Sequence, residues 1–359
     1  ALALQILARQ AAGPRKAAIL KDQRLKGMVQ ALQDHAQHLE VWILCSGSAA
    51  LGRLGTLSLH AAHATAAAAD ELLRRSQEKL GHFSKAQAAL LLASLALVPE
   101  RLSSAVGSEL RNSLVSMLEL QSQDLPPEAC AQLAPALVKL RSQSETLAQG
   151  LAKRLSACDL TELSPEDVAK AAQSLVALRQ APNKLMEATE QVLRHQIHLC
   201  TPRAIVHFAG SLSEGRGDVD VFKDFLMPAA RSFISDFNCR DLCTIAESFA
   251  KAGCAEADFL ADLAEMLQRK VGDMGAHEVS VAFQVFAPIS YAVPALLPAV
   301  TQRAMEVASE LSPKQLTHTL QGLSRSQLDA EPLLPALKRR AQQLAHVLFG
   351  APWELLWAG

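Results

Sequence analysis

Aromatic residues are scarce in this sequence of 359 residues, where they make up 4% and Tyr291 is the single tyrosine. Hydrophobic residues reach 50%, and most of them are Ala and Leu, which favour helices. The β-branched and aromatic residues that favour strands are few. The composition therefore predicts an all-α protein.

An excess of charge is also lacking, since 35 Lys and Arg stand against 36 Asp and Glu and give a formal net charge of −1. This balance provides no overall cationic field to attract nucleic acid or an anionic membrane, so any polyanion site must be a local stripe. The longest uncharged runs, such as residues 86–99, are shorter than the roughly 20 residues of a membrane helix. We therefore predict no membrane span.

A disulfide framework is lacking as well. The 7 cysteines are an odd number scattered along the chain, which indicates a reducing compartment and mostly buried thiols. Cys239, Cys243 and Cys254 are close in sequence, but their spacing is not that of a structural zinc site. No metal and no cofactor are predicted.

What the sequence does contain is an internal repeat. Six segments align when they are written from Leu125, Leu163, Cys200, Phe237, Met274 and Leu311, and their starts are 38, 37, 37, 37 and 37 residues apart. A further copy begins at Phe83, and a degenerate copy begins near Leu39. Irregular terminal copies are typical of repeat proteins, in which they cap the array.

The columns of the repeat predict a helical hairpin. Position 1 is apolar, position 2 is usually Ser, Thr, Asn or Gly, and position 3 is Pro in four copies, as a hydrophobic staple, an N-cap and an N1 proline require. An apolar stripe follows, as in Val168, Ala172 and Leu175, and predicts helix A of about 14 residues. Small residues at position 10 would let neighbouring A helices approach closely. After a short break, Met186, Thr189 and Val192 show the same period and predict helix B.

A single hairpin of this size cannot bury both apolar faces, so the copies must stack into an α-solenoid of about seven to eight repeats over residues 39–348. We expect copies to start near residues 39, 83, 125, 163, 200, 237, 274 and 311. Residues 1–38 would form an N-terminal helical cap or a partial repeat. The apolar tail, residues 349–359, would cap the solenoid or dock into a partner. Residues 1–21 are basic, as in the tail of an organellar targeting segment or in an ordinary basic helix.

The period of about 37 and these columns resemble the heptatricopeptide and octotricopeptide repeats of organellar proteins, and also the helical repeats of FAST-kinase-like proteins. The resemblance covers about residues 83–348. It implies an RNA-binding protein of the mitochondrion, or alternatively of the plastid, that acts on transcripts or ribosomal RNA. Many members carry a C-terminal RAP domain, which we do not find in this sequence. HEAT-type scaffolds, which have longer periods, remain an alternative.

One column could contact RNA phosphates. Position 4 is Arg203, Arg240, His277 and Lys314 in the last four regular copies, each 37 residues from the next, in the first turn of helix A. In earlier copies the same position is Ala86, Glu128 and Glu166. An ordinary solvated face is the alternative, since Asp241 and Glu278 lie beside two of the cations.

Polar residues at positions 8 and 11 would face a groove and could read bases, one repeat to one base. These residues are Lys170, Gln173, His207, Gln284, His318 and Gln321. Cations also gather near the ends of the B helices, where the helix dipole favours them.

The sequence shows no Gly-rich phosphate loop, no Gly-x-Ser-x-Gly elbow and no HExxH motif, and an open solenoid seldom supplies an enclosed active site. We therefore expect a binding protein with no catalytic residues, and no small-molecule substrate. One hypothesis is an organellar RNA-binding protein, as a component of a mitochondrial ribosome or an RNA stability or processing factor. The other is a protein–protein interaction scaffold in a large organellar complex, without RNA contact.

Overall fold

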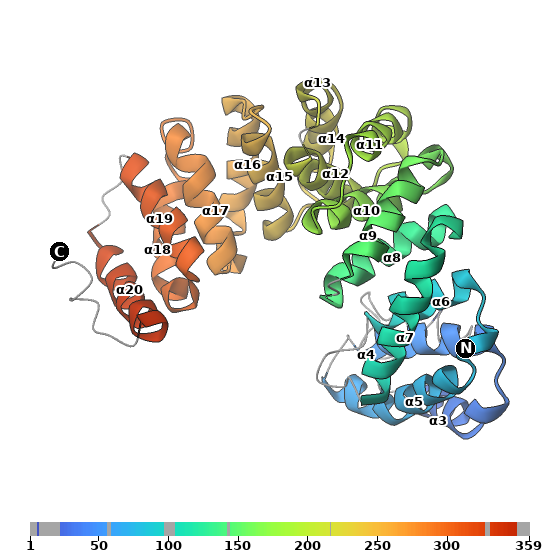
Figure 1. Ribbon diagram of the computed structural model, residues 1–359. Helices are drawn as coiled ribbons and strands as arrows, with labels where there is room; N and C mark the ends of the chain where they lie inside the picture. Colours follow the sequence, from blue (N-terminus) through green and yellow to red (C-terminus); the bar gives the residue numbers. More distant parts are fainter. Residues whose placement is uncertain are drawn as a thin grey trace. The chain divides into compact units, whose positions relative to one another are not determined.

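The computed structural model describes residue 6 and residues 22–55, 59–96, 105–141, 144–215, 217–326 and 331–349. Within these ranges the chain forms helices and turns and no strand, which confirms the prediction of an all-α helical-repeat fold (Figure 1). The rest of the proposed targeting segment and the apolar tail from residue 350 onward lie outside the described residues. Among the helices that the structure describes, none combines the length and apolarity needed to cross a membrane.

The chain divides into two compact units, residues 1–192 and 193–359, which we call the N-terminal and C-terminal units. The boundary falls within α11 (Asn183–Gln196). The N-terminal unit contains α3 (Gln23–Asp34), α4 (Val41–Gly55), α5 (Leu59–Glu78), α6 (Lys85–Leu95), α7 (Ala105–Gln121), α8 (Pro127–Lys139), α9 (Glu145–Ser156) and α10 (Pro165–Ala177).

Helices at the same place in successive repeats stack on one another within the N-terminal unit. The A helices pack in the order α4, α6, α8 and α10, and the B helices pack in the order α5, α7 and α9. Helix α3 packs on α5, where Leu25, Val29 and Leu32 join a buried cluster with Leu44 and Leu72. Each helix therefore buries its apolar stripe against the neighbouring repeat.

The C-terminal unit repeats this arrangement with α12 (Pro202–Glu214), α15 (Cys239–Lys251), α17 (Ala276–Phe286) and α19 (Pro313–Arg325) as stacked A helices. Its B helices are α16 (Ala257–Arg269), α18 (Leu296–Val307) and α20 (Leu334–Phe349). The B helix after α12 is irregular, since α13 (Val219–Val221), a π-helical segment (Phe222–Leu226) and α14 (Met227–Ser232) follow one another. Pro228 lacks the N–H of a regular helical turn, and its ring crowds the carbonyl four residues earlier, which favours the wider π turn.

The predicted starts of the A helices are confirmed. The side chains of Ser84, Ser164, Thr201, Asn238 and Ser312 accept hydrogen bonds from backbone N–H groups in the first turns of α6, α10, α12, α15 and α19. The prolines at position 3 are the first helical residues of α8, α10, α12 and α19. Most B helices end in a 3-10 turn directly before position 1, as in Ser122–Asp124 before Leu125. The repeat therefore ends and restarts within a few residues.

The core follows the columns of the repeat. The large apolar residue at position 13 is buried in every copy from Phe83 onward, and these residues are Leu95, Leu137, Leu175, Leu212, Phe249, Phe286 and Leu323. The small residues predicted to allow close approach, Ala134, Ala172, Ala209 and Ala246, are also buried. A close approach of two backbones occurs at Gly322 on α19, where a Cβ atom would lie 2.5 Å from the carbonyl oxygen of Phe283 on α17. Consecutive A helices therefore pack nearly backbone to backbone at this point.

Candidate nucleic-acid interface

Four residues of the C-terminal unit, Arg203, Arg240, His277 and Lys314, form what we call the cationic rim. Each is the second residue of its A helix, in α12, α15, α17 and α19, and each side chain is exposed. These helices stack in sequence and are each followed by a helix that returns, so their N-terminal ends lie along one edge of the unit. The structure therefore places the predicted column on one side of a single compact unit.

The side chains of the rim are available to a ligand. Within the described part of the chain, none of the four forms an ion pair or a hydrogen bond. The neighbouring acids are engaged elsewhere, because the carboxylate of Asp241 accepts from the backbone N–H of Asn238 at 3.3 Å and that of Glu278 from Gly275 at 3.1 Å. These acids cap their helices and do not pair with the cations beside them.

The rim cations are placed against the helix dipole. The N-terminus of a helix carries partial positive charge, so a cation in the first turn is unfavourable by about 0.3–1 kcal/mol, the amount by which an acid there would be favourable. In the N-terminal unit the same position holds an acid, Glu128 in α8 and Glu166 in α10, which the helix dipole stabilises. The stability of the fold therefore does not explain why the C-terminal unit has cations at this position.

The six predicted groove residues are divided between the two units. Lys170 and Gln173 lie on α10 in the N-terminal unit, whereas His207, Gln284, His318 and Gln321 lie on α12, α17 and α19 in the C-terminal unit. Lys170 forms an ion pair with Glu166. The amide oxygen of Gln284 is buried, and Gln321 is exposed. A base-reading role for these residues stays a prediction.

Several cations of the B helices have a structural role that the sequence did not reveal. The Nε atoms of Arg154, Arg303 and Arg340 donate to the carbonyl oxygens of Leu125, Met274 and Leu311, at 2.9, 2.8 and 2.7 Å. Each acceptor is position 1 of the same repeat. Lys270 donates in the same way to the carbonyl of Phe237. We call this contact the position-1 clasp, and it closes a hairpin by joining a cation of helix B, or of the residue directly after it, to the residue two positions before helix A.

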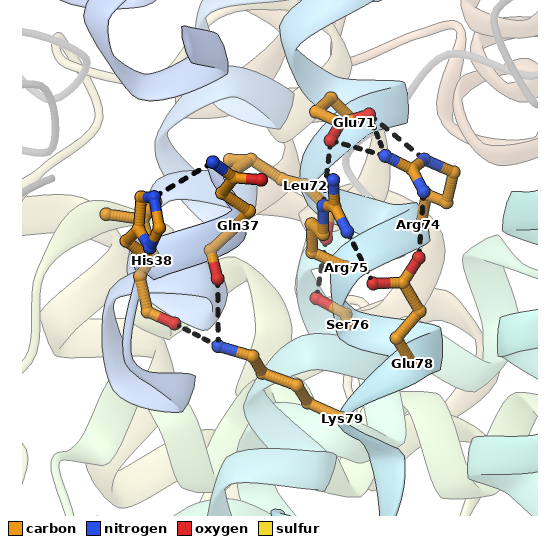
Figure 2. A network of polar contacts seen from close by, with 10 residues as sticks. Gln37, His38, Glu71, Leu72, Arg74, Arg75, Ser76, Glu78 and Lys79 are labelled. Carbon is orange, nitrogen blue, oxygen red and sulfur yellow. Dashed lines mark hydrogen bonds and ion pairs between the residues drawn. The ribbon is translucent and has the colours of Figure 1, made fainter. Parts of the chain in front are cut away.

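Helix α5 also shows cations used within the fold. Lys79, directly after this helix, donates to the carbonyl oxygens of Gln37 and Leu39 at 3.5 and 2.7 Å, and Figure 2 shows its contact with Gln37. On the same helix, Arg74 and Arg75 form ion pairs with Glu71 and Glu78. Hydrogen bonds from Arg74 lower the pKa of Glu71 from its usual value. The positive charge of α5 is therefore neutralised locally and does not extend the cationic surface.

Replacing Arg303 by Ala tests whether the clasp cations stabilise the fold without contributing to RNA binding, as the rim cations are proposed to do. The variant loses a hydrogen bond from a charged donor, and we expect the free energy of unfolding to fall by about 1.5–3 kcal/mol. Urea denaturation would measure this loss. RNA binding by the fraction that is still folded should keep the wild-type salt dependence. A change in that dependence with stability unchanged would instead place Arg303 at the ligand.

The described residues contain no group of three or more His, Cys, Asp or Glu side chains that could hold a metal ion. All seven cysteines are free, and all but Cys158 are buried, which confirms the prediction of mostly buried thiols. Burial raises the pKa of Cys45 and of Cys130 to about 12. These two thiols therefore stay protonated and unreactive at neutral pH.

Residues 195–348 match a protein family described as RNA-editing substrate-binding complex 6 protein. The match covers less than half of the chain and falls within the C-terminal unit, which carries the cationic rim. It supports the coarser part of the resemblance, an RNA-associated family of helical proteins, and does not support the heptatricopeptide or octotricopeptide type. No curated protein matches the chain.

Proposed function

We propose that the protein is a non-catalytic RNA-binding subunit of an organellar ribonucleoprotein complex, and that the cationic rim holds the phosphates of a single RNA strand. The observation that carries the proposal is the set of exposed rim cations without partners, placed where the helix dipole disfavours them. The backbone N–H groups of the four helix N-termini point to the same edge and would add donors for phosphate oxygens.

The family match supports the same proposal, because its name refers to an RNA-editing substrate-binding complex and its span includes all four rim residues. A role in such a complex would need no catalytic residue and no cofactor in this chain. We further propose a mitochondrial location, with the plastid as the alternative. In either organelle the protein would serve as a ribosome component or as a factor in RNA stability or processing.

A salt series with labelled single-stranded RNA tests the proposal. Phosphate neutralisation releases counterions, so the logarithm of the binding constant should fall linearly with the logarithm of salt between about 50 and 200 mM. Three fully charged rim residues would give a slope of about −2, because single strands contribute about −0.7 per phosphate. Fluorescence anisotropy would measure the binding constants.

Absence of RNA binding at low salt would contradict the proposal and favour a protein–protein scaffold without RNA contact. The balanced charge of the chain, −1 overall, is the observation that supports this alternative. A scaffold should bind its partner with little dependence on salt, since most of its contact energy would come from buried apolar surface.

A further inference from the structure

The turn between α10 and α11 and helix α9 line a shallow cavity of about 580 Å³ that is open to solvent and lies entirely within the N-terminal unit. Its lining includes three cations, Lys153, Arg179 and Lys184, and no acid, while Ala152, Ala181 and Pro182 supply apolar surface. We call this cavity the Arg179 pocket. Within the described residues, none of the three cationic side chains forms an ion pair or a hydrogen bond. The pocket therefore combines uncompensated positive charge with an apolar floor.

The backbone of Arg179 is in the left-handed region, with φ of 58°. It ends α10 in a Schellman motif, in which the N–H of Arg179 donates to Val176 at 2.9 Å and that of Gln180 to Leu175 at 2.8 Å. Glycine adopts this conformation without strain, and Gly253, with φ of 72°, ends α15 with the same pair of bonds. An arginine at such a position is strained relative to glycine, which makes its side chain a candidate for a role in binding.

The preceding repeat has the same arrangement. Arg141, 38 residues before Arg179, ends α8 with φ of 48°. It lines a cavity of about 530 Å³ with Arg111 and Glu119. The carboxylate of Glu119 accepts hydrogen bonds from the hydroxyl groups of Ser144, at 2.6 Å, and Thr146. A left-handed arginine beside a cavity therefore occurs in two consecutive copies of the N-terminal unit, and only the Arg179 pocket lacks an acid.

We infer that the Arg179 pocket binds one nucleotide of single-stranded RNA. The three cations would hold its phosphate, and the apolar floor would receive its ribose and base. A phosphate offers several anionic oxygens to donors that converge from different directions, which suits two ammonium groups and a guanidinium fork. The site lies in the other unit from the rim and rests on the proposed function, since the same ligand would occupy both.

The pocket can be tested by measuring how RNA binding depends on salt in three variants. These are a double substitution in the pocket, a double substitution elsewhere as its control, and one single substitution. The pocket variant is Lys153→Ala/Lys184→Ala, and its control is Lys26→Ala/Lys139→Ala, which removes two other exposed lysines without partners from the same unit. We expect the pocket variant to lose about 10-fold in affinity and about 1 unit of salt slope. The control should lose little of either.

The single variant Arg179→Gly separates binding from folding. Glycine keeps both backbone N–H bonds of the turn and relieves the left-handed strain, so the melting temperature should not fall. RNA affinity should nevertheless fall several-fold, because the guanidinium is gone. A lower melting temperature together with unchanged affinity would show that the arginine is structural and would overturn the inference.

The outcomes separate this inference from the proposed function. If both pocket variants bind RNA as tightly as the wild type and a rim variant does not, the inference about the pocket is wrong and the proposed function stands. No RNA binding by the wild type would overturn both. Titration with AMP and with an acidic peptide identifies the source of the anion. RNA would be excluded as the occupant if the pocket bound AMP but did not bind RNA. It would also be excluded if the acidic peptide bound more tightly than RNA and this binding depended on Lys153 and Lys184.

Discussion

The variant Arg203→Glu/Arg240→Glu/Lys314→Glu should bind single-stranded RNA about 100- to 1,000-fold more weakly than the wild type at low salt. Each substitution removes an exposed charge-assisted contact and replaces it with repulsion, at about 1 to 1.4 kcal/mol for the two effects together, so three substitutions cost about 3 to 4 kcal/mol. The salt slope should fall by about 2, because three phosphate contacts of about 0.7 each are lost. Fluorescence anisotropy across the same salt series would measure both quantities.

The physical reason for choosing glutamate is that it should not harm the fold. An acid at the second residue of a helix interacts favourably with the helix dipole, and Glu128 and Glu166 already occupy this position in α8 and α10. The melting temperature of the triple variant should therefore equal or exceed that of the wild type. Weaker binding with unchanged stability could then be assigned to the rim itself.

The matched control is Lys223→Glu/Arg325→Glu/Arg339→Glu, which makes the same change of net charge in the same unit. All three residues are exposed and none is at position 4 of a repeat, since they lie in the π-helical segment, at the end of α19 and in α20. We expect this control to lose much less affinity than the rim variant. Equal losses in the two variants would show that only overall charge matters, and the rim would then be an ordinary solvated face.

The hairpins could be predicted from sequence because their signals are local. A hydroxyl or amide side chain followed by proline, as in Ser164 and Pro165, determines where an A helix begins, and the bonds that do so lie within the same turn. The stripe ending at position 13 then determines the buried face. For the same reason the rim residues could be placed on one edge of the stack before their exposure was known.

The position-1 clasp could not be predicted, because it joins residues 29 or 33 apart whose distance depends on how tightly the hairpin closes. Arg154, Arg303 and Arg340 lie 29 residues after Leu125, Met274 and Leu311, and nothing in the sequence around an arginine of a B helix indicates a carbonyl acceptor so far away. The Arg179 pocket was missed for a similar reason. An arginine after a helix gives no sign of a left-handed backbone, since glycine is the residue that indicates it.

The family match and the two compact units both divide the chain near residue 193, whereas the repeat continues through this point without a break. Residues 195–348 fall in the unit whose A helices begin with cations, whereas the copies that begin with Glu128 and Glu166 lie outside the match. The same type of hairpin therefore places positive charge at different positions in the two units. In the C-terminal unit its helix N-termini carry positive charge, and in the N-terminal unit positive charge gathers at the turns after the A helices.

Replacing Phe249 by Ala should lower the free energy of unfolding of the C-terminal unit by about 3–5 kcal/mol. This ring is fully buried on α15 and lies between two others. Phe222, on the irregular B helix of the preceding copy, meets it edge-on with centroids 5.2 Å apart, and Phe259 on α16 lies at 4.7 Å. Truncation would remove the contact between two repeats and leave a cavity that neighbouring helices cannot easily close.

Urea denaturation followed by circular dichroism would measure the loss, with Phe249→Leu as the control. Leucine occupies this position in Leu175 and Leu212, so the control should lose less than about 1.5 kcal/mol. A loss below about 1 kcal/mol for the alanine variant would show that the repeats close around the cavity. RNA binding gives a second readout, because the spacing of Arg203 and Arg240 depends on how α12 packs on α15. The folded fraction of the alanine variant should keep the wild-type salt slope, whereas the apparent affinity of the whole sample should fall in proportion to the folded fraction that remains.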